Sequence, residues 1–86
     1  MDKEKMNKKG KQKSPTKIDQ HAGKRLRYRR DQCDLTRKQL GDKLGIARTS
    51  IEHYENASCR MSLSRAYELA KALGVSVDYF YEGFDK

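Results

Sequence analysis

The chain has 86 residues, of which 20 are Lys or Arg and 12 are Asp or Glu, so its formal net charge is +8. This length allows one domain with a small core, in which roughly 60% of the surface of the unfolded chain is buried. A positive charge of this size favours polyanionic partners such as nucleic acid or an acidic membrane surface. The sequence has no run of about 18 apolar residues, which excludes a transmembrane helix.

Residues 1–17 are predicted to form a flexible, lysine-rich tail, and residues 18–86 the folded domain. The tail contains seven lysines, and its apolar residues are Met1 and Met6. A segment with so few apolar residues cannot bury a face and is expected to be disordered alone. Pro15 marks its end, because proline disfavours helix at the residue before it.

The first predicted helix begins near Ile18, where apolar residues start to repeat with helical spacing. Asp19 at its start and the arginines of its later turns suit the helix dipole. The residues of its apolar face are Ile18, Ala22, Leu26 and Cys33. We expect some of the basic residues between positions 24 and 30 to lie on a solvated face and others to contact phosphate.

The second predicted helix begins after Thr36, which has the spacing of a capping box with Gln39. Two leucines four residues apart form its inward side. Gly41, between them, costs about 1 kcal/mol relative to alanine in a helix, so we predict that the following segment crosses closely there. Gly45 is placed to end the helix in the left-handed conformation.

A third, short helix is predicted from Ala47 or Arg48 to Glu55. Ile51 and Tyr54 are three residues apart and form its inward side. Because so short a helix with few apolar residues is marginal by itself, its outward face is free to serve a purpose other than folding. The outward residues are Arg48, Thr49, Glu52 and His53.

The remaining residues predict a fourth and a fifth helix. Ser62 caps the fourth helix, and Gly74 ends it. Ser76 caps a short fifth helix from Val77 to about Glu82. The apolar stripe of the fourth helix consists of Leu63, Ala66, Tyr67, Leu69, Ala70 and Leu73. The expected fold class is therefore all-α, a bundle of five helices.

The stretch from 35 to 56, LTRKQLGDKLGIARTSIEHYEN, resembles the helix-turn-helix of the Cro and phage-repressor (XRE-type) family. The later KALGVSVDYF is similar to the junction of the fourth and fifth helices in that family. The resemblance covers about residues 20–82. It implies a five-helix lambda-repressor-like DNA-binding bundle, with its helix-turn-helix at about 36–55 and the second helix of that motif in the major groove.

The resemblance implies contacts to DNA from both helices of the motif. The residues implied to read bases are Ala47, Arg48, Thr49, Glu52 and His53. The residues implied to contact phosphate are Thr36, Arg37, Lys38, Ser50 and Asn56. By its chemistry Arg48 suits guanine O6 and N7, and Glu52 suits cytosine N4. The alternatives are an Arg48–Glu52 pair on a solvated surface and an exposed His53 without a role.

Two positions depart from the pattern of the family. Many relatives have glutamine where this chain has Arg37, which supplies charge but no accepting carbonyl. Relatives often cap the third helix with Ser or Thr, whereas Ala47 has no side-chain oxygen to accept a hydrogen bond. The start of this helix is therefore expected to be looser or to be ordered by DNA.

Aromatic residues gather at the end of the domain, where four of the seven in the chain lie between positions 79 and 84. Phe80 is expected in the core, and Tyr79, Tyr81 and Phe84 are the candidates for a homodimer interface. A dimer brings two recognition helices to half-sites one helical turn apart. A monomer with a solvated aromatic end is the alternative.

These features predict a sequence-specific DNA-binding transcriptional regulator, a repressor that binds double-stranded DNA at an operator as a homodimer. The lysine-rich tail either adds electrostatic binding to the duplex or aids solubility. The alternative function is a helix-turn-helix module that binds a protein or RNA, for example an antitoxin-type protein. The acidic Glu52 and Glu55 and the missing cap leave room for it.

An enzyme, a metal site and a cofactor are not expected. The histidines are His21 and His53, and no nucleophile and base are arranged together. Cys33 and Cys59 are far apart without a CxxC motif, so they are interpreted as reduced thiols of a cytoplasmic protein. The charged start of the chain lacks the apolar region of a secretory signal, and no membrane partner is expected.

Overall fold

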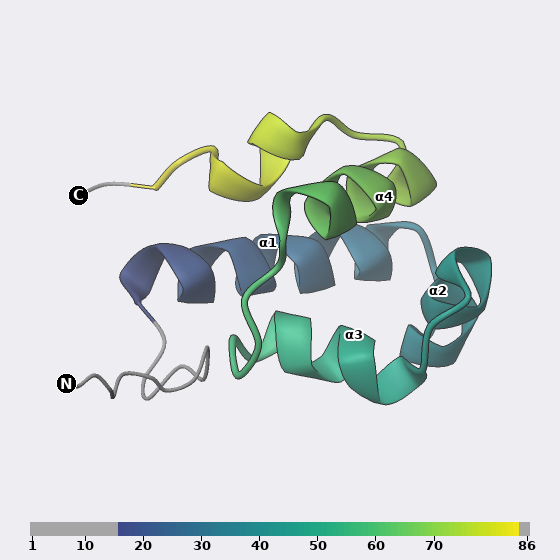
Figure 1. The fold of residues 1–86 in the computed structure, drawn as a ribbon. Coiled ribbons are helices and arrows are strands. Elements are labelled where there is room, and N and C mark those ends of the chain that lie inside the picture. Colours follow the sequence, from purple (N-terminus) through teal and green to yellow (C-terminus); the bar gives the residue numbers. More distant parts are fainter. Residues whose placement is uncertain (1–15, 85–86) are drawn as a thin grey trace, which may run out of the picture.

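The structure, a computed structural model, describes residues 16–84, so nearly all of the predicted flexible tail lies outside the described residues. Within this range all of the regular secondary structure is helical (Figure 1). The helices are α1 (Lys17–Gln32), α2 (Arg37–Leu44), α3 (Arg48–Glu55), α4 (Leu63–Leu73) and a 3-10 helix, η1 (Val77–Tyr81). None of these helices is long and apolar enough to cross a membrane.

Local end signals set the helix boundaries largely as the sequence predicts. Thr36 Oγ1 accepts from the Gln39 amide at 3.0 Å, and the Gln39 side chain accepts from the Thr36 amide at 2.9 Å. Ser62 caps α4 through the Arg65 amide. Gly45 and Gly74 end α2 and α4 in the left-handed conformation, both at φ 73°. The capping box and both glycine ends are therefore confirmed.

The prediction of a fifth α-helix is wrong, because the described residues contain four α-helices followed by η1. The segment after Ser76 has five helical residues, and its amides bond three residues back, as from Tyr79 to the Ser76 carbonyl at 3.0 Å. Such short segments are typical of 3-10 helices, whose hydrogen bonds join residues three apart rather than four apart. Phe80 still points into the core and is fully buried.

One small core fills the space between the helices. Its buried residues are Ala22, Leu26, Leu40, Ile51, Ala66, Leu69, Ala70, Leu73 and Phe80. Three residues predicted to lie on apolar faces are exposed instead, with exposures of 40% for Ile18, 80% for Leu63 and 59% for Tyr67. The predicted stripe of α4 is too wide, because Ala66, Leu69, Ala70 and Leu73 already fill the buried side of the helix.

Helix α1 lies in the middle of the molecule, with α3 along the lower edge of Figure 1 and α4 above. It packs against α3 and η1, while α2 packs against α3 and α4. Three α1 side chains, four residues apart, donate to carbonyls near the C-terminal end. His21 binds Glu82, Arg25 binds Tyr79 and Arg29 binds Leu73, at 2.6, 2.9 and 2.9 Å. These basic residues therefore have internal partners.

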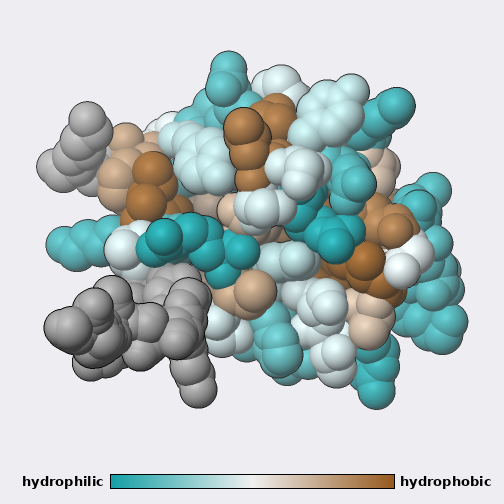
Figure 2. All heavy atoms as spheres, in the orientation of Figure 1, coloured by the Kyte–Doolittle hydropathy of each residue, from teal (hydrophilic) through white to brown (hydrophobic). Residues whose placement is uncertain are grey.

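Most of the exposed residues among 16–84 are polar or charged. In the view of Figure 2, apolar side chains reach the surface as separate patches between hydrophilic ones. This distribution suits a small basic domain with a minimal core.

Candidate nucleic-acid interface

The turn between α2 and α3 is fixed by two glycines. Gly45 reverses the chain at positive φ, and the Ile46 amide then donates to the Gly41 carbonyl at 2.9 Å. A Cβ on Gly41 would lie 2.6 Å from the Ile46 carbonyl oxygen, which is closer than real side chains approach. The close approach predicted for Gly41 is confirmed, and the approaching segment is the backbone that leads into α3.

The outward face of α3 is exposed throughout. The five residues that the resemblance assigns to base reading are all exposed, namely Ala47, Arg48, Thr49, Glu52 and His53. Within residues 16–84 no ion pair joins Arg48 to Glu52, and the side chains of these four polar residues have no protein partner. The face therefore presents donors and acceptors that the fold does not use.

The inward face of α3 lies against α1. Ile51 is fully buried and Tyr54 half-buried, as predicted. Gly23 of α1 permits the approach, since a Cβ there would lie 2.5 Å from the Glu55 carbonyl oxygen and 2.7 Å from that of Tyr54. The backbone of α3 is thus in direct contact with α1, which sets the position of the outward face.

Glu55 at the end of α3 is the centre of a buried charge network. Its side chain is 2% exposed and is bound by Arg30 of α1, with Nε donating to Oε2 at 2.6 Å and Nη2 to Oε1 at 3.2 Å. Arg30 also donates to the Leu35 carbonyl at 2.7 Å. The hydrogen bonds to Glu55 raise the pKa of Arg30 above its usual value, so its charge is held firmly.

Arg37 completes this network from α2. Its Nε donates to Glu55 Oε1 at 3.0 Å, and its side chain remains 38% exposed. The terminal nitrogens of Arg37 have no partner among residues 16–84. Glu55 therefore links the three helices α1, α2 and α3. It also binds one side of the Arg37 guanidinium, whose other side is exposed at the start of α2.

The other residues assigned to phosphate differ in what they do within the fold. The Thr36 hydroxyl is engaged in the capping box, and Lys38 pairs with Asp42 at 3.0 Å on an exposed surface. Ser50 is half-buried. Asn56 is exposed, and its side-chain oxygen accepts from the Ser58 amide at 2.9 Å. Their contacts with phosphate stay a prediction.

Helix α3 starts without a side-chain cap and is fixed beyond its other end. Ala47 is the N-cap residue and makes no side-chain hydrogen bond, as predicted. After α3, Arg60 donates to the Asp19 carboxylate of α1 at 3.1 Å. Although burial by itself raises it, the hydrogen bonds from Thr16 and Arg60 hold the pKa of Asp19 below its usual value. The loop after α3 is thereby tied to the first turn of α1.

The three residues predicted for a dimer interface have different surroundings. Tyr79 lies under the guanidinium of Arg25, whose central carbon is 3.9 Å from the centre of the ring. Phe84 is half-buried with its ring centre 5.6 Å from that of His21. Tyr81 is 37% exposed. Their role between two copies of the chain stays a prediction.

Three residues of the site were not predicted from the sequence: Gly23, Arg30 and the buried Glu55. Gly23, like Gly41, is a glycine inside a predicted helix, where it costs helix propensity. A close backbone contact at Gly23 could therefore have been predicted for the same reason. Arg30 and Glu55 are 25 residues apart, and neither periodicity nor composition indicates that they pair.

The family model for the helix-turn-helix matches residues 26–80, and the chain belongs to this family. A curated relative is a transcriptional regulator, itself uncharacterised, from the ATPase CF(0) region of Rhodospirillum rubrum. It is 38% identical over 69 residues, which are 80% of this chain and 64% of the relative. The chain spans about half to two-thirds of the length of the first curated relatives that it matches.

Solved structures share the fold. The P22 c2 repressor, solved in complex with a synthetic operator, is 28% identical with a TM-score of 0.67, over 73% of this chain and 96% of the repressor. The match to hydroxypropylphosphonic acid epoxidase from S. wedmorenis has a TM-score of 0.71 at 24% identity. It covers 77% of this chain but 36% of the enzyme, so this likeness shows the fold alone. The curated relatives are named as transcriptional regulators, and the family shared with them is the helix-turn-helix family.

Proposed function

We propose that this domain is a sequence-specific reader of double-stranded DNA, which represses transcription by binding an operator as a homodimer. The observation that carries the proposal is the outward face of α3, whose polar side chains are exposed and unused by the fold. The repressor–operator structure with the same fold supports it. A helix presented in this way enters the major groove with its first residues at the base edges.

Each residue of the face has a role within this proposal. Arg48 donates to guanine O6 and N7, Thr49 contacts a thymine methyl and Glu52 accepts from cytosine N4. His53 donates to phosphate or to a base acceptor. The exposed terminal nitrogens of Arg37 bind phosphate, while Glu55 fixes the orientation of the guanidinium. The residues around this set, Thr36, Lys38, Ser50 and Asn56, are proposed to add further phosphate contacts.

The alternative, a module that binds protein or RNA, rested partly on two acidic residues. The structure buries Glu55 against Arg30, which leaves Glu52 as the acidic residue exposed on α3. A single carboxylate between Arg48 and His53 suits a base-reading face, because glutamate accepts from the cytosine amine. The geometry therefore favours DNA over this alternative.

The experiment is a selection of binding sites from random duplex DNA with the wild-type chain and two variants. Arg48→Ala is expected to lose preference at one base pair of each half-site, by about 1–3 kcal/mol, because a bidentate contact is lost. Arg27→Ala is the matched control, since Arg27 is a 63% exposed arginine of α1 outside the motif. It is expected to select the same sequence as the wild type.

The wild type is expected to enrich an inverted repeat. If no sequence is enriched, or if Arg48→Ala and Arg27→Ala select the same site with the same preference at every position, the outward face of α3 does not read DNA. A comparison of binding to structured RNA under the same salt conditions then tests the alternative function.

A further inference from the structure

A hollow of about 650 Å³ lies between the end of α2 and α4. Its lining residues all belong to these two helices and are Lys43, Leu44, Tyr67, Glu68, Lys71 and Ala72. We call this hollow the α2–α4 groove. Because only two helices line it, the groove has two walls and is otherwise open to solvent, so a small molecule there would keep much of its surface in water. Its shape therefore suits a segment of polypeptide.

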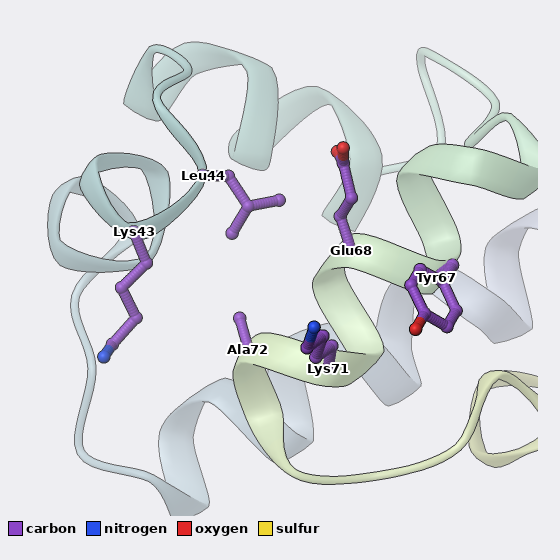
Figure 3. Close-up of a pocket in the computed structure, with 6 residues that line it drawn as sticks. All are labelled: Lys43, Leu44, Tyr67, Glu68, Lys71 and Ala72. Carbon is purple, nitrogen blue, oxygen red and sulfur yellow. The ribbon is translucent and has the colours of Figure 1, made fainter.

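The middle of the α2–α4 groove is apolar and is not filled by the fold. Figure 3 shows Leu44 reaching from α2 toward this space, with Ala72 facing it from α4. Both side chains are half-buried and pack against the edge of the core. Tyr67 is 59% exposed, and its hydroxyl forms no hydrogen bond within residues 16–84. An apolar side chain of an occupant would remove these three surfaces from water together.

The charges around the groove indicate the chemistry of its occupant. Glu68 binds Arg65 at 3.0 Å, whereas Lys43 and Lys71 form no ion pair within the described part of the chain. In the view of Figure 3 the amino ends of the two lysines lie on one side of Leu44, and the Glu68 carboxylate lies on the other. The lysines suit the helix dipoles, since they lie in the last turns of α2 and α4, and their charges remain available to a partner. The groove thus combines an apolar middle with an edge that favours carboxylates.

We propose that the α2–α4 groove binds an acidic amphipathic helix of another protein. The apolar side of this helix lies over Leu44, Tyr67 and Ala72, as amphipathic helices lie in apolar grooves. Its carboxylates pair with Lys43 and Lys71. The net charge of +8 also attracts an acidic partner before contact is made.

The position of the groove gives this partner a use that goes beyond the proposed function. In Figure 1, α3 and α4 lie at opposite edges of the view with α1 between them. A partner in the groove therefore leaves the outward face of α3 open and is brought to whatever α3 binds. A second copy of this chain is a poorer occupant, because pairing on this side would point the two outward α3 faces away from each other. The proposal rests on DNA reading only for this use.

The first experiment selects peptides from a random displayed library with the full 86-residue chain, without DNA. The enriched peptides are expected to combine leucine or aromatic residues with Asp or Glu at helical spacing. Fluorescence anisotropy then measures their binding to two double variants. Lys43→Glu with Lys71→Glu is expected to weaken binding at least tenfold. Lys17→Glu with Lys24→Glu, at two exposed lysines of α1, is the control with the same net charge and is expected to bind nearly as the wild type does.

Thermal unfolding checks that both double variants remain folded. The proposal is overturned if no peptide is enriched, if the enriched peptides lack acidic residues, or if the two double variants bind equally well. A milder pair of substitutions tests the apolar contact. Tyr67→Ser is expected to weaken binding, whereas Tyr28→Ser, at an α1 tyrosine with a similar exposure of 56%, is not. Equal binding of these two variants also overturns the proposal.

Two further measurements separate the groove from other surfaces and occupants. On addition of an enriched peptide, the amide chemical shifts are expected to change at the end of α2 and along α4, and changes centred on α3 overturn the proposal. Sedimentation equilibrium without peptide is expected to give equal self-association for the wild type and the variant with Lys43→Glu and Lys71→Glu. Weaker self-association of the variant would place a second copy in the groove and overturn the proposal. Because these measurements contain no DNA, they give the same answer whether or not the chain selects a DNA sequence.

Discussion

Helices α2 and α3 have eight residues each and form one motif, yet different parts of the chain stabilise them. Helix α2 has a complete capping box at Thr36 and a left-handed glycine at its end. Helix α3 starts at Ala47 without a cap, and its contacts with α1, through Ile51 and Glu55, hold it in place. The comparison shows that a helix whose outward face makes no contacts within the fold is stabilised from its inward face.

Removal of the Glu55 carboxylate is expected to have the largest effect. Glu55→Ala leaves the charge of Arg30 buried without its main partner, with Asp31 at 3.4 Å as the remaining carboxylate, and breaking a buried pair in this way costs about 3–5 kcal/mol. Thermal and denaturant unfolding measure the loss. Glu52→Ala, on the outward face of the same helix, is the control and is expected to change stability by less than about 0.5 kcal/mol. Equal effects of the two variants would contradict the anchoring of α3 through Glu55.

The close contact of α1 with α3 gives the second effect. Gly23→Ala places a Cβ against the backbone carbonyls of Tyr54 and Glu55, which have no rotamer to change. The α1–α3 spacing must therefore increase, at a cost of about 1–3 kcal/mol despite the better helix propensity of alanine. Lys24→Ala, at the exposed neighbouring position, is expected to be neutral or slightly stabilising. A Gly23→Ala variant as stable as the wild type would show that the helices move apart freely.

The cap of α2 gives a smaller effect. Thr36→Ala removes the oxygen that accepts from the Gln39 amide, and a lost N-cap costs about 1 kcal/mol. For a domain of this size, this corresponds to a decrease of roughly 4–8 °C in the melting temperature. Lys38→Ala, in the first turn of the same helix, controls for helix propensity and is expected to change the melting temperature little.

Adding a cap to α3, the opposite of removing the cap of α2, also tests the comparison. Ala47→Ser supplies the missing cap oxygen at a residue that already has the extended conformation of an N-cap, with φ −71° and ψ 149°. A gain of about 0.5 kcal/mol is expected in thermal unfolding without DNA. A loss of stability would mean that the start of α3 is not limited by its cap.

An effect of similar size concerns Asp19 and depends on pH. Because its pKa is lowered in the folded state, the carboxylate stabilises the fold above the unfolded pKa of about 3.9, and this contribution is lost as the pH falls through the folded pKa. Asp19→Asn is therefore expected to destabilise the domain by about 0.5 kcal/mol at neutral pH. The difference from the wild type should be smaller at pH 3. A difference that stays constant over this range would exclude the titration of Asp19 as its origin.

Local signals made much of the fold predictable. The capping residues and terminal glycines act on backbone groups three or four residues away, so the sequence pattern contains both partners of each interaction. For this reason the ends of α2 and α4, the left-handed Gly45 and the tight packing at Gly41 agree with the prediction. The exposed residues of α3 were also predictable, because the few apolar positions of that helix define the opposite side.

Interactions between distant residues were not predictable in the same way. Nothing near Glu55 in the sequence indicates that Arg30 and Arg37 bind it, since the three lie on different helices. The width of the buried stripe on α4 depends on how much core the other helices leave, so Leu63 and Tyr67 were wrongly placed inside. The 3-10 helix was predicted as an α-helix because an apolar pattern after a serine does not distinguish helix types over five residues. The predicted cap is also wrong, since Ser76 makes no side-chain cap hydrogen bond.

The attachment of the C-terminal segment to α1 has a consequence for how this region changes in evolution. His21, Arg25 and Arg29 donate to main-chain carbonyls of residues 73–82, and every residue type has such a carbonyl. Substitutions in the segment therefore leave these three attachments available, provided that the path of the backbone and the buried Phe80 are kept. Its outer side chains are free to diversify toward new partners while the segment remains attached to the same helix.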